Sequence, residues 1–452
     1  MSKYKRYERY KDSGIEWIGE IPEHWEITKL KYICSESAVY GLNESAENYV
    51  EEGVRFIRTT DIDNKGNLDN SMGGVFLPEE KVKGYILKTG DLLVSRSGSL
   101  GTSLYFDEDK YGKCSYAGYL VKFRANSKNC PKFLFYFSKS NIFYIQIQLA
   151  LVSSTISNFN GNKYANMILP LPSYYEQKAI SNFLDQKTAE IDSLIADKEK
   201  LIELLQEKRQ AIITEAVTKG LNPNVRMKDS GIEWIGEIPE HWEVSKIKFT
   251  TYVKGRIGWQ GLRADEFIDE GPYLVTGTDF VDGLVNWDSC YHISMERYNE
   301  APPIQLREND LLITKDGTIG KVAIVKNKPK YAILNSGIFV TRPKNSAYLT
   351  EFMYWILNSQ VFNKFIQYMS LGSTIVHLYQ QTFENFSFPI TNLNEQKTIA
   401  HFLDRKVAEI DGLISDIKLQ IQKLKEYRQS LISEAVTGKI DVREFGSISE
   451  VI

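Results

Sequence analysis

The residues best suited to phosphate chemistry lie in a polar, glycine-bearing turn in the second half of the chain. The hexapeptide Asp316-Gly317-Thr318-Ile319-Gly320-Lys321 superficially resembles a phosphate-binding loop. Its glycines are only three residues apart, and Val322 stands where such a loop carries the hydroxyl that binds magnesium. The turn therefore does not predict a nucleotide-hydrolysing enzyme.

Other signatures of catalysis are missing from the sequence. No glycine-rich turn opens a helix as dinucleotide or adenosyl cofactors require, and there is neither an Asn-Pro-Pro-aromatic tetrapeptide for amino methylation nor a His-Glu-x-x-His motif. The cysteines form no Cys-x-x-Cys pair, which argues against a disulfide framework or a zinc site; they are Cys34, Cys114, Cys130 and Cys290. A duplicated chain without a duplicated catalytic constellation is expected to bind rather than to catalyse, and to hold no metal or cofactor itself.

Positive charge is concentrated in two segments, although the whole chain has a formal net charge of −3. Residues 81–133 hold ten Lys/Arg against four Asp/Glu, a net +6, and residues 303–348 hold eight against three, a net +5. Tyrosines and phenylalanines are interleaved with these charges. The pattern suits contacts with DNA phosphates, which provide affinity and fix register. The alternative is that lysine-rich hairpins merely keep each domain soluble.

Bases are read by side-chain donors and acceptors in a groove of the duplex, so the candidates are polar turns that occupy equivalent places in the two halves but differ in residue type. Three such places occur in each half. The predicted DNA-contacting residues are Tyr40, Gly41, Arg58, Thr60, Asp61, Arg96 and Ser97 in the first half, and Arg256, Gly258, Trp259, Thr276, Thr278, Asp279, Lys315 and Asp316 in the second. The two aspartates Asp61 and Asp279 fit the role of turn caps equally well.

Two variable regions of nearly equal length, residues 27–173 and 244–392, must position these turns. Both are rich in short β-type runs. Phe56–Asp61 lies opposite Leu274–Asp279, in each case a strand that runs into a polar turn, and each glycine-bearing turn follows a buried strand. The two regions are therefore expected to share a mixed α/β fold.

An identical sixteen-residue stretch precedes each variable region, at Lys11–Glu26 and Lys228–Glu243. Its tryptophans stand among prolines and glycines, which indicates a compact loop that buries aromatic rings. We expect a structural plug that seats each domain on its helix, with no chemistry for His24 or His241. Recent duplication or a shared partner surface would also explain the identity.

Two long helices are predicted at Glu176–Thr218 and Glu395–Thr437, which share 25 identities in 43 positions. Capping boxes open them at Ser173 and Asn392, and Gly220 and Gly438 close them. Apolar residues at heptad spacing predict a coiled-coil seam, with Leu184, Ile191, Ile195, Ile202, Leu205 and Ile212 on the first helix and Leu403, Ile410, Ile414, Ile417, Ile421, Leu424 and Leu431 on the second. Each seam carries one arginine, Arg209 and Arg428. An amphipathic pair packed on an ordinary core is the alternative.

Two similar halves in one chain normally pack about a pseudo-two-fold axis, which makes the two helices antiparallel. The predicted fold class is α+β, with two similar α/β domains at opposite ends of an antiparallel two-helix spacer roughly 60 Å long. The chain termini should then meet at the first domain. The expected boundaries are 1–172 and 221–391 for the domains, 173–220 and 392–439 for the helices, and 440–452 for a tail that frays or docks weakly.

The composition fits an ordered protein of 452 residues, because 42% of them are hydrophobic and 12% aromatic. No apolar run reaches membrane-spanning length, and the polar start does not resemble a signal peptide. We expect a cytoplasmic protein with no membrane partner, and the family resemblance described next implies a prokaryotic one.

The chain resembles the specificity subunits of type I restriction–modification enzymes over nearly its whole length. The loop Gly-Ile-x-Trp-Ile-Gly-x-Ile-Pro-x-His-Trp at Gly14–Trp25 and Gly231–Trp242 is similar to that family, as are the helix entries at Pro170–Gln177 and Pro389–Gln396. The resemblance implies two target-recognition domains, each reading one half of a bipartite site in double-stranded DNA. It also implies a non-catalytic subunit that recruits two modification subunits and the restriction subunits, on which S-adenosylmethionine, ATP and magnesium are expected.

Two alternatives remain open at this stage. A duplicated coiled-coil scaffold that binds only proteins would show no salt-dependent affinity for DNA. A self-contained methyltransferase or nuclease with diverged motifs would show activity in the isolated chain.

Overall fold

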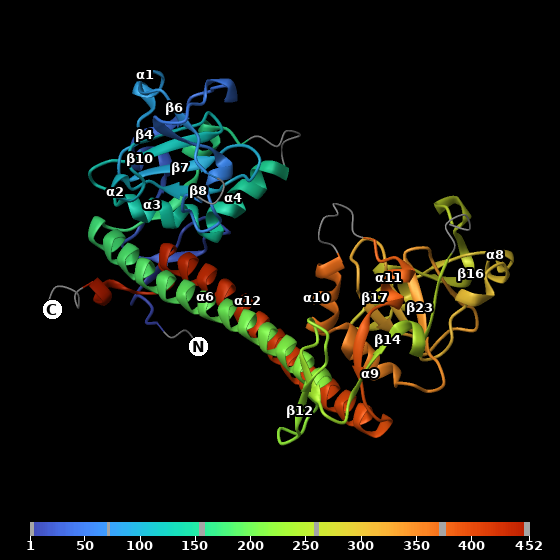
Figure 1. The fold of residues 1–452 in the computed structure, drawn as a ribbon. Coiled ribbons are helices and arrows are strands. Elements are labelled where there is room, and N and C mark those ends of the chain that lie inside the picture. Colours follow the sequence, from blue (N-terminus) through green and yellow to red (C-terminus); the bar gives the residue numbers. More distant parts are fainter. Residues whose placement is uncertain (1–3, 70–72, 153–158, 257–261, 370–376, 447–452) are drawn as a thin grey trace. The chain divides into compact units, whose positions relative to one another are not determined.

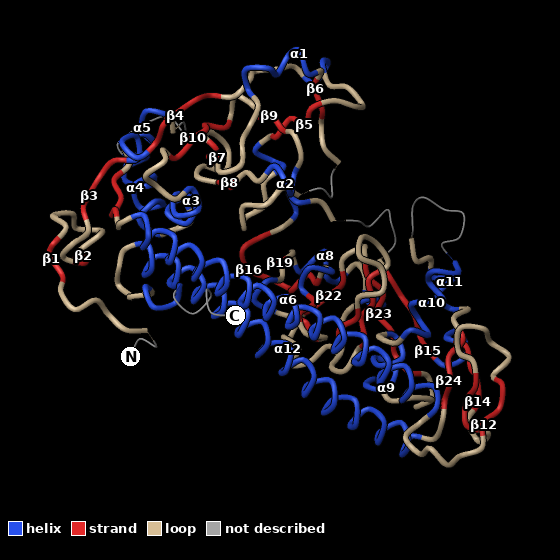
Figure 2. The backbone as a smooth tube through the Cα atoms, turned by 90° about the vertical axis from the view of Figure 1, so that its left-hand side faces the viewer, coloured by secondary structure: helices blue, strands red, loops and turns tan. Residues whose placement is uncertain are grey.

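The computed structural model describes residues 4–69, 73–152, 159–256, 262–369 and 377–446 (Figure 1). The chain divides into two compact units, one formed by Met1–Lys198 with Lys418–Ile452 and the other by Glu199–Ile417. Each unit mixes short strands with helices, as Figure 2 shows in red and blue. Because each unit includes parts of both long helices, its bounds run through the helices rather than between helix and domain.

The first unit is built on two sheets. The four-stranded sheet has the order β4-β10-β7-β8, with neighbouring strands antiparallel, and the three-stranded sheet has the order β6-β5-β9, with β5 and β9 parallel. The strands are β1 (Tyr10–Asp12), β2 (Glu20–Pro22), β3 (Glu26–Lys29), β4 (Cys34–Tyr40), β5 (Val54–Ile57), β6 (Phe76–Leu77), β7 (Asp91–Ser95), β8 (Ser103–Tyr105), β9 (Cys114–Tyr116), β10 (Leu120–Ala125) and β11 (Ile168–Leu171). The helices are α1 (Glu79–Val82), α2 (Glu108–Tyr111), α3 (Pro131–Ser138), α4 (Asn141–Val152) and α5 (Gly161–Ala165).

The second unit repeats this plan. Its larger sheet has the order β15-β23-β20-β21-β18-β17, whose first four strands match β4-β10-β7-β8, and in its smaller sheet β16 pairs in parallel with β22. The strands are β12 (Met227–Asp229), β13 (Glu237–Pro239), β14 (Glu243–Lys246), β15 (Thr251–Gly255), β16 (Ile268–Val275), β17 (Phe280–Val281), β18 (Leu284–Val285), β19 (Tyr291–His292), β20 (Leu311–Thr314), β21 (Val322–Ile324), β22 (Ala332–Leu334), β23 (Ile338–Pro343) and β24 (Ser387–Ile390). The helices are α7 (Ile247–Thr250), α8 (Met295–Asn299), α9 (Thr350–Leu357), α10 (Gln360–Met369) and α11 (Gln380–Glu384).

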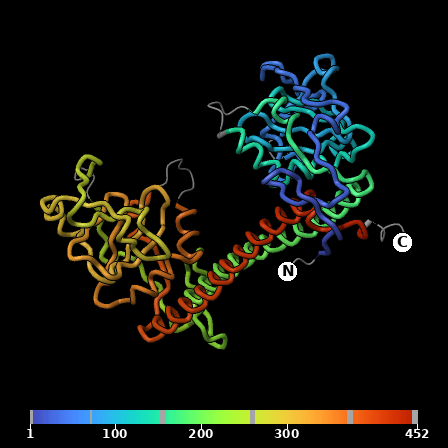
Figure 3. The backbone as a smooth tube through the Cα atoms, turned by 180° about the vertical axis from the view of Figure 1, so that it is seen from behind, coloured from blue at the N-terminus to red at the C-terminus, as the bar shows by residue number. Residues whose placement is uncertain are grey.

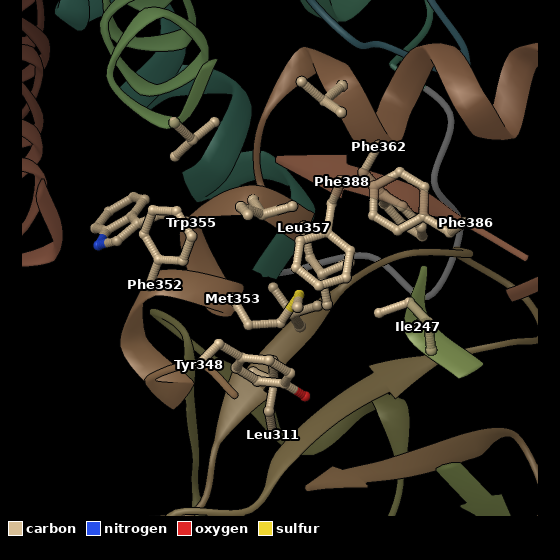
Figure 4. Close-up of a cluster of buried hydrophobic side chains, with 14 of the residues drawn as sticks. Ile247, Leu311, Tyr348, Phe352, Met353, Trp355, Leu357, Phe362, Phe386 and Phe388 are labelled. Carbon is tan, nitrogen blue, oxygen red and sulfur yellow. The ribbon is translucent and has the colours of Figure 1, made fainter. Parts of the chain in front are cut away.

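Aromatic side chains fill the core between the sheet and helices of the second unit. Phe352, Phe362, Phe386 and Phe388 are fully or almost fully buried, and they converge with Met353 from α9 (Figure 4). Burial of a large apolar side chain contributes about 1.5–3 kcal/mol. The core therefore fixes the strands of the second unit, and with them the polar turns that follow these strands.

The two long helices are α6 (Tyr174–Lys219) and α12 (Leu393–Val436). In the first unit Arg428 pairs with Asp192 at 3.3 Å, and Lys198 donates to Gln420 at 2.6 Å. In the second unit Arg209 pairs with Asp411 at 2.9 Å. Rising numbers on α6 meet falling numbers on α12 in the first unit, so the helices are antiparallel there, as predicted.

The heptad positions form the interior of the helix pair. Nine of the thirteen are buried, namely Leu184, Ile191, Ile195, Leu403, Ile410, Ile414, Ile417, Ile421 and Leu431, and four are half-buried, namely Ile202, Leu205, Ile212 and Leu424. The seam arginines lie at its margin, where each reaches an aspartate of the opposite helix. These ion pairs help to fix which residues of the two helices lie opposite each other, in a contact that is otherwise apolar.

The first copy of the repeated loop joins the start of α6 to the end of α12. Trp25 is fully buried and its Nε1 donates to Glu176 Oε1 at 3.3 Å, while His24 Nε2 lies 2.9 Å from the same oxygen. Gly438 ends α12 with a φ of +70°, and a Cβ there would lie 2.4 Å from Pro22 Cδ. The predicted plug is therefore correct, and the fit requires glycine at the helix end.

The second copy makes the same junction in the second unit. His241 Nε2 lies 3.1 Å from Glu395 Oε2 at the start of α12, and Trp242 packs against Gly220 at the end of α6. Gly220 has a φ of +73°, the left-handed conformation expected of a helix-closing glycine. Both predicted helix ends are thus confirmed.

The capping boxes hold the helix starts. Ser173 Oγ donates to Glu176 Oε2 at 2.9 Å, and the Glu176 amide donates back to Ser173 Oγ at 3.4 Å. At the second helix the Glu395 amide donates to Asn392 Oδ1 at 3.0 Å. Burial disfavours ionisation of Glu176, but hydrogen bonds from His24, Ser173 and Trp25 outweigh it and lower the pKa of the carboxyl.

The tail is ordered more firmly than predicted up to Gly446. Ile440 and Val442 are buried, Phe445 packs edge-on against Phe183 with ring centroids 5.0 Å apart, and the Asp441 amide donates to Lys5 O at 2.8 Å. The described residues near both ends of the chain, such as Lys5 and Phe445, therefore lie in the first unit, as the pseudo-symmetry predicts (Figure 3). The three apolar residues were too few to give a periodic signal in the sequence. Over the described ranges, no helix is long and apolar enough to cross a membrane.

Candidate nucleic-acid interface

The glycine-bearing turns have the same backbone in both units. The turn after β7 has Gly98 and Gly101 at φ values of +70° and +80°, and the turn after β20 has Gly317 and Gly320 at +69° and +82°. A hydroxyl at the end of each strand closes the turn, Ser95 Oγ onto Ser99 O and Thr314 Oγ1 onto Thr318 O. The two turns therefore share a backbone frame, residues 95–101 and 314–320, that carries different side chains in the two units.

In the first unit this frame presents a cation against an aromatic ring. The Arg96 guanidinium carbon lies 5.0 Å from the centroid of the Tyr40 ring, and Tyr40 is 41% exposed. The Tyr40 hydroxyl accepts a hydrogen bond from the Gly161 amide at 2.8 Å, which fixes the ring. Stacking of this kind orients an arginine whose remaining donors suit a guanine edge or a phosphate. Ser97 is half-buried beside it.

In the second unit the turn presents the side chains of Lys315 and Asp316, and His377 meets them from the segment before α11. His377 Nδ1 lies 2.6 Å from Asp316 Oδ1, and the Lys315 ammonium lies 5.2 Å from the Phe339 ring centroid. These groups line an open pocket of about 470 Å³ that also includes Arg256 and the 68% exposed Tyr379. The pocket offers both donors and acceptors beside an aromatic surface, which is the combination that base recognition uses.

The aspartates that follow strands β5 and β16, Asp61 and Asp279, have a structural role at these strand-to-turn junctions. Asp61 is 4% exposed and accepts from Arg58 N at 2.8 Å and Arg58 Nη2 at 2.7 Å. Asp279 is 2% exposed and accepts from Thr276 N at 2.7 Å and from Ser289 Oγ at 3.0 Å. Both carboxylates cap their turns and are turned away from solvent, so the structure favours the alternative prediction for them.

The neighbours of these aspartates remain accessible to different extents. Thr60 and Thr278 are exposed. Arg58 is held by Asp61, whose hydrogen bond raises the pKa of the guanidinium. Thr276 Oγ1 lies 2.7 Å from Thr278 Oγ1. The two exposed threonines are the residues of these junctions best placed to meet a ligand.

Two other predicted residues serve the fold. A Cβ on Gly41 would lie 2.3 Å from Ala117 O, so glycine is needed for close backbone approach. Arg256 is 3% exposed and donates to Leu334 O at 3.0 Å; burial, and then Arg297, lower its pKa. Gly258 and Trp259 lie outside the described residues.

Part of the predicted positive charge is also structural. Arg124 Nε lies 2.6 Å from the buried Asp91, and Arg342 Nε lies 2.6 Å from the buried Asp310 at the equivalent place. Lys122 lies 2.7 Å from Glu36 and lowers its pKa through a hydrogen bond. Only a part of each basic segment is therefore left for a polyanion.

Sequence reasoning missed His377 and Tyr379, which reach the pocket from the segment before α11. His377 is 61 residues away from Asp316, so no local spacing could pair them. An aromatic residue close behind a histidine, Tyr379 after His377, is the signal that the sequence offered. Across the described ranges, no group of three or more His, Cys, Asp or Glu could hold a metal ion.

Comparison with known proteins places this architecture in a family. The family model described as type I restriction modification DNA specificity domain matches residues 22–204 and 239–423. The MjaVIII and putative MjaX type I restriction enzyme specificity subunits of Methanocaldococcus jannaschii are 23% and 27% identical over 442 residues, covering 94% of this chain and 94% and 96% of theirs. The EcoBI specificity subunit of Escherichia coli is 23% identical, covering 95% of this chain and 89% of its own.

Solved structures share the fold at low sequence identity. A chain from a structural study of the assembly and conformational transition of the type I R-M system matches with a TM-score of 0.72 at 15% identity, covering 92% of this chain and 98% of that one. The HsdS subunit of Thermoanaerobacter tengcongensis matches with a TM-score of 0.55 at 16% identity, over 93% of this chain and 98% of its own. With its two matched domains joined to paired helices, the chain belongs to the type I restriction–modification DNA specificity family.

Proposed function

We propose that the chain is the non-catalytic specificity subunit of a type I restriction–modification complex and that each unit reads one half of a bipartite DNA target. The observation that carries this is the common turn frame with divergent side chains, Arg96 over Tyr40 in one unit and Lys315, Asp316 and His377 in the other. A shared frame fixes how a duplex docks, and differing donors and acceptors make the two half-sites different.

The proposal includes assembly with two modification subunits and with restriction subunits. Each unit carries its own copy of the loop-and-helix junction, which supports two equivalent places for one kind of partner. In this proposal S-adenosylmethionine, ATP and magnesium bind to those partners. The present chain would supply the choice of sequence and the assembly surface.

The named relatives favour this function over the two alternatives. They are specificity subunits, and they match this chain over nearly its full length. A protein-only scaffold gives no reason for polar turns that differ on a common frame. A self-contained enzyme gives no reason for two half-sites read by a duplicated domain.

The test is to co-express the chain with the modification subunit of its complex and to map methylated bases in the host genome. We expect a two-part motif with a fixed spacer that disappears when the chain is omitted. Methylation of the same sites without the chain would contradict the proposal. Salt-independent DNA affinity of the assembled complex would favour the scaffold, and methylation by the isolated chain would favour the enzyme.

A further inference from the structure

A cationic pocket lies within the first unit, where the globular domain meets the helix pair. It has a volume of about 290 Å³ and is lined by five basic side chains, Lys65, Lys110, Lys132, Lys139 and Arg428. Three aspartates face them, so the lining carries a net positive charge. The pocket is separate from the turns that we assign to base reading, and this inference does not depend on that assignment.

The ammonium of Lys139 is the least expected group in the pocket. Lys139 is 6% exposed, and its Nζ donates to Ser103 O at 3.0 Å and to Asn64 O at 3.4 Å. An ammonium has three donors, and no described carboxylate forms an ion pair with this one. Burial lowers its pKa to about 8, although the nearby Asp63 favours the charged form. The two carbonyls and the Phe135 ring, whose centroid lies 5.4 Å from the ammonium, stabilise this buried cation in part, and an anion in the pocket would stabilise it further.

The equivalent place in the second unit has the same frame. Tyr136 donates to Asp185 at 2.7 Å, as Trp355 donates to Asp404 at 2.9 Å. Gln429 Nε2 donates to Lys139 O at 2.7 Å, as Gln210 Nε2 donates to Asn358 O at 3.0 Å. The ion pair of Arg428 with Asp192 likewise matches that of Arg209 with Asp411.

The units differ at several positions of the lining, and three lysines are among them. Lys139 corresponds to Asn358, Lys132 corresponds to Glu351, and Lys65 before the turn glycine corresponds to Asp282. Three positive charges in the first unit thus stand where the second unit has two negative charges and one amide, while Asp107 of the lining stands where the second unit has Lys326. Over these four positions the first unit carries a net +2 and the second a net −1. Asn358 donates from its side-chain amide to Tyr354 O of its own helix at 2.9 Å, whereas the Lys139 ammonium reaches carbonyls of two other segments.

We propose that this pocket binds a phosphate group. The Lys139 ammonium would donate to the anion from the base of the pocket. At the rim, Lys65 now pairs with Asp192 and Lys132 with Asp185, and both lysines would turn from these aspartates to the anion. Tyr105, Phe135 and Tyr136 add aromatic walls that suit a phosphate ester. The phosphate comes either from a free pyrophosphate or nucleotide or from the backbone of bound DNA.

The test compares the intact chain, assembled with its modification subunits, with Lys139→Asn, which copies the second unit. Lys132→Glu copies it at a second position and keeps the test valid if the first variant folds poorly. Lys128→Asn, on the exposed surface of the same unit, is the matched control. Calorimetric titration with pyrophosphate and duplex affinity at several salt concentrations are measured for all four proteins.

We expect either pyrophosphate affinity or duplex affinity to fall about tenfold or more in Lys139→Asn and Lys132→Glu but not in Lys128→Asn. Loss of pyrophosphate binding with unchanged duplex affinity identifies a free anion as the ligand. Loss of duplex affinity with a smaller salt slope, together with competition by pyrophosphate, identifies the DNA backbone. If both affinities are unchanged in both pocket variants, the proposal is wrong. Failure of the chain to direct methylation would leave the pyrophosphate result standing.

Discussion

The two units agree where the chain packs against itself and differ where side chains meet open space. The sixteen-residue loop is identical in both, and in both it joins the start of one long helix to the glycine at the end of the other. The turns at Arg96 and Lys315 share their glycine conformations but not their side chains. The buried part of the loop, with Trp25 and Trp242 at the helix ends, is therefore held by packing, whereas the turns keep their backbone and vary in the side chains that they expose.

The comparison also explains why the halves form one molecule. The ion pairs Arg428–Asp192 and Arg209–Asp411 are images of each other, since the arginines and the aspartates occupy equivalent positions on the two helices. Each helix therefore carries both the donor and the acceptor needed by an antiparallel partner. This property makes one half of the chain complementary to itself.

The largest effect is expected from separating the halves. A fragment ending at Met227 keeps α6 and Gly220 but loses α12, so its apolar stripe needs a new partner. A second copy offers the same stripe, with Arg209 of one copy opposite Asp192 of the other. With modification subunits added, the dimer should methylate an inverted repeat of the first half-site.

Sedimentation and methylome mapping decide this prediction. Arg209→Glu in the fragment is a suitable control, because it places a like charge opposite Asp192 and should weaken the dimer. A stable folded monomer of the unmodified fragment, or methylation of the original asymmetric site, would show that the halves are not interchangeable.

The second effect concerns the shared junction. Trp25 is fully buried between helix start and helix end, so Trp25→Ala should cost about 3–5 kcal/mol of unfolding free energy in the first unit. Trp242→Ala should do the same in the second unit. Denaturation of each variant can be compared with Trp17→Ala, whose parent side chain is only half-buried. If Trp25→Ala and Trp17→Ala lowered the unfolding free energy by the same amount, the special role of Trp25 at the junction would be wrong.

The third effect concerns the divergent turns. Arg96→Ala should relax one position of the first half-site, and Lys315→Ala or Asp316→Asn one position of the second, each by about 1–3 kcal/mol of discrimination. Subunit assembly should not change. Methylome sequencing reports both half-sites at once, so the untouched half is the control. Variants that alter neither half-site nor affinity would remove these turns from the interface.

The sequence was informative where a pattern repeats over many residues. Heptad spacing predicted the buried stripes of α6 and α12, and the exact duplication predicted a shared junction around Trp25 and Trp242. Both signals are local in sequence and are reinforced by their second copy. The fold class and the helix ends at Gly220 and Gly438 followed from them.

The candidate sites were less accessible because they depend on distant pairing. In the sequence, an aspartate that caps a turn, as Asp61 and Asp279 do, cannot be told from one that lines an open pocket, as Asp316 does. His377 reaches Asp316 from 61 residues away. Lys139 looks like a surface lysine until the fold buries it, so its comparison with Asn358 has meaning only in the structure.

The smallest effect concerns the charge at the helix starts. The pKa of Glu176 is lowered in the folded chain, so its stabilisation is complete above the pKa of an unfolded glutamate, about 4.3, and is lost as pH falls through the folded value. Glu176→Gln should therefore lower the free energy of local opening of the first turns of α6 by about 1 kcal/mol at pH 7, which is measured as faster hydrogen exchange. The difference from the parent should vanish at low pH. Glu395 also has a lowered pKa, but its side chain is 27% exposed against 9% for Glu176, so Glu395→Gln should have the smaller effect on α12. If the two variants gave equal exchange at both helix starts, solvent exposure would not distinguish the junctions, and the two units would be energetically as well as geometrically equivalent there.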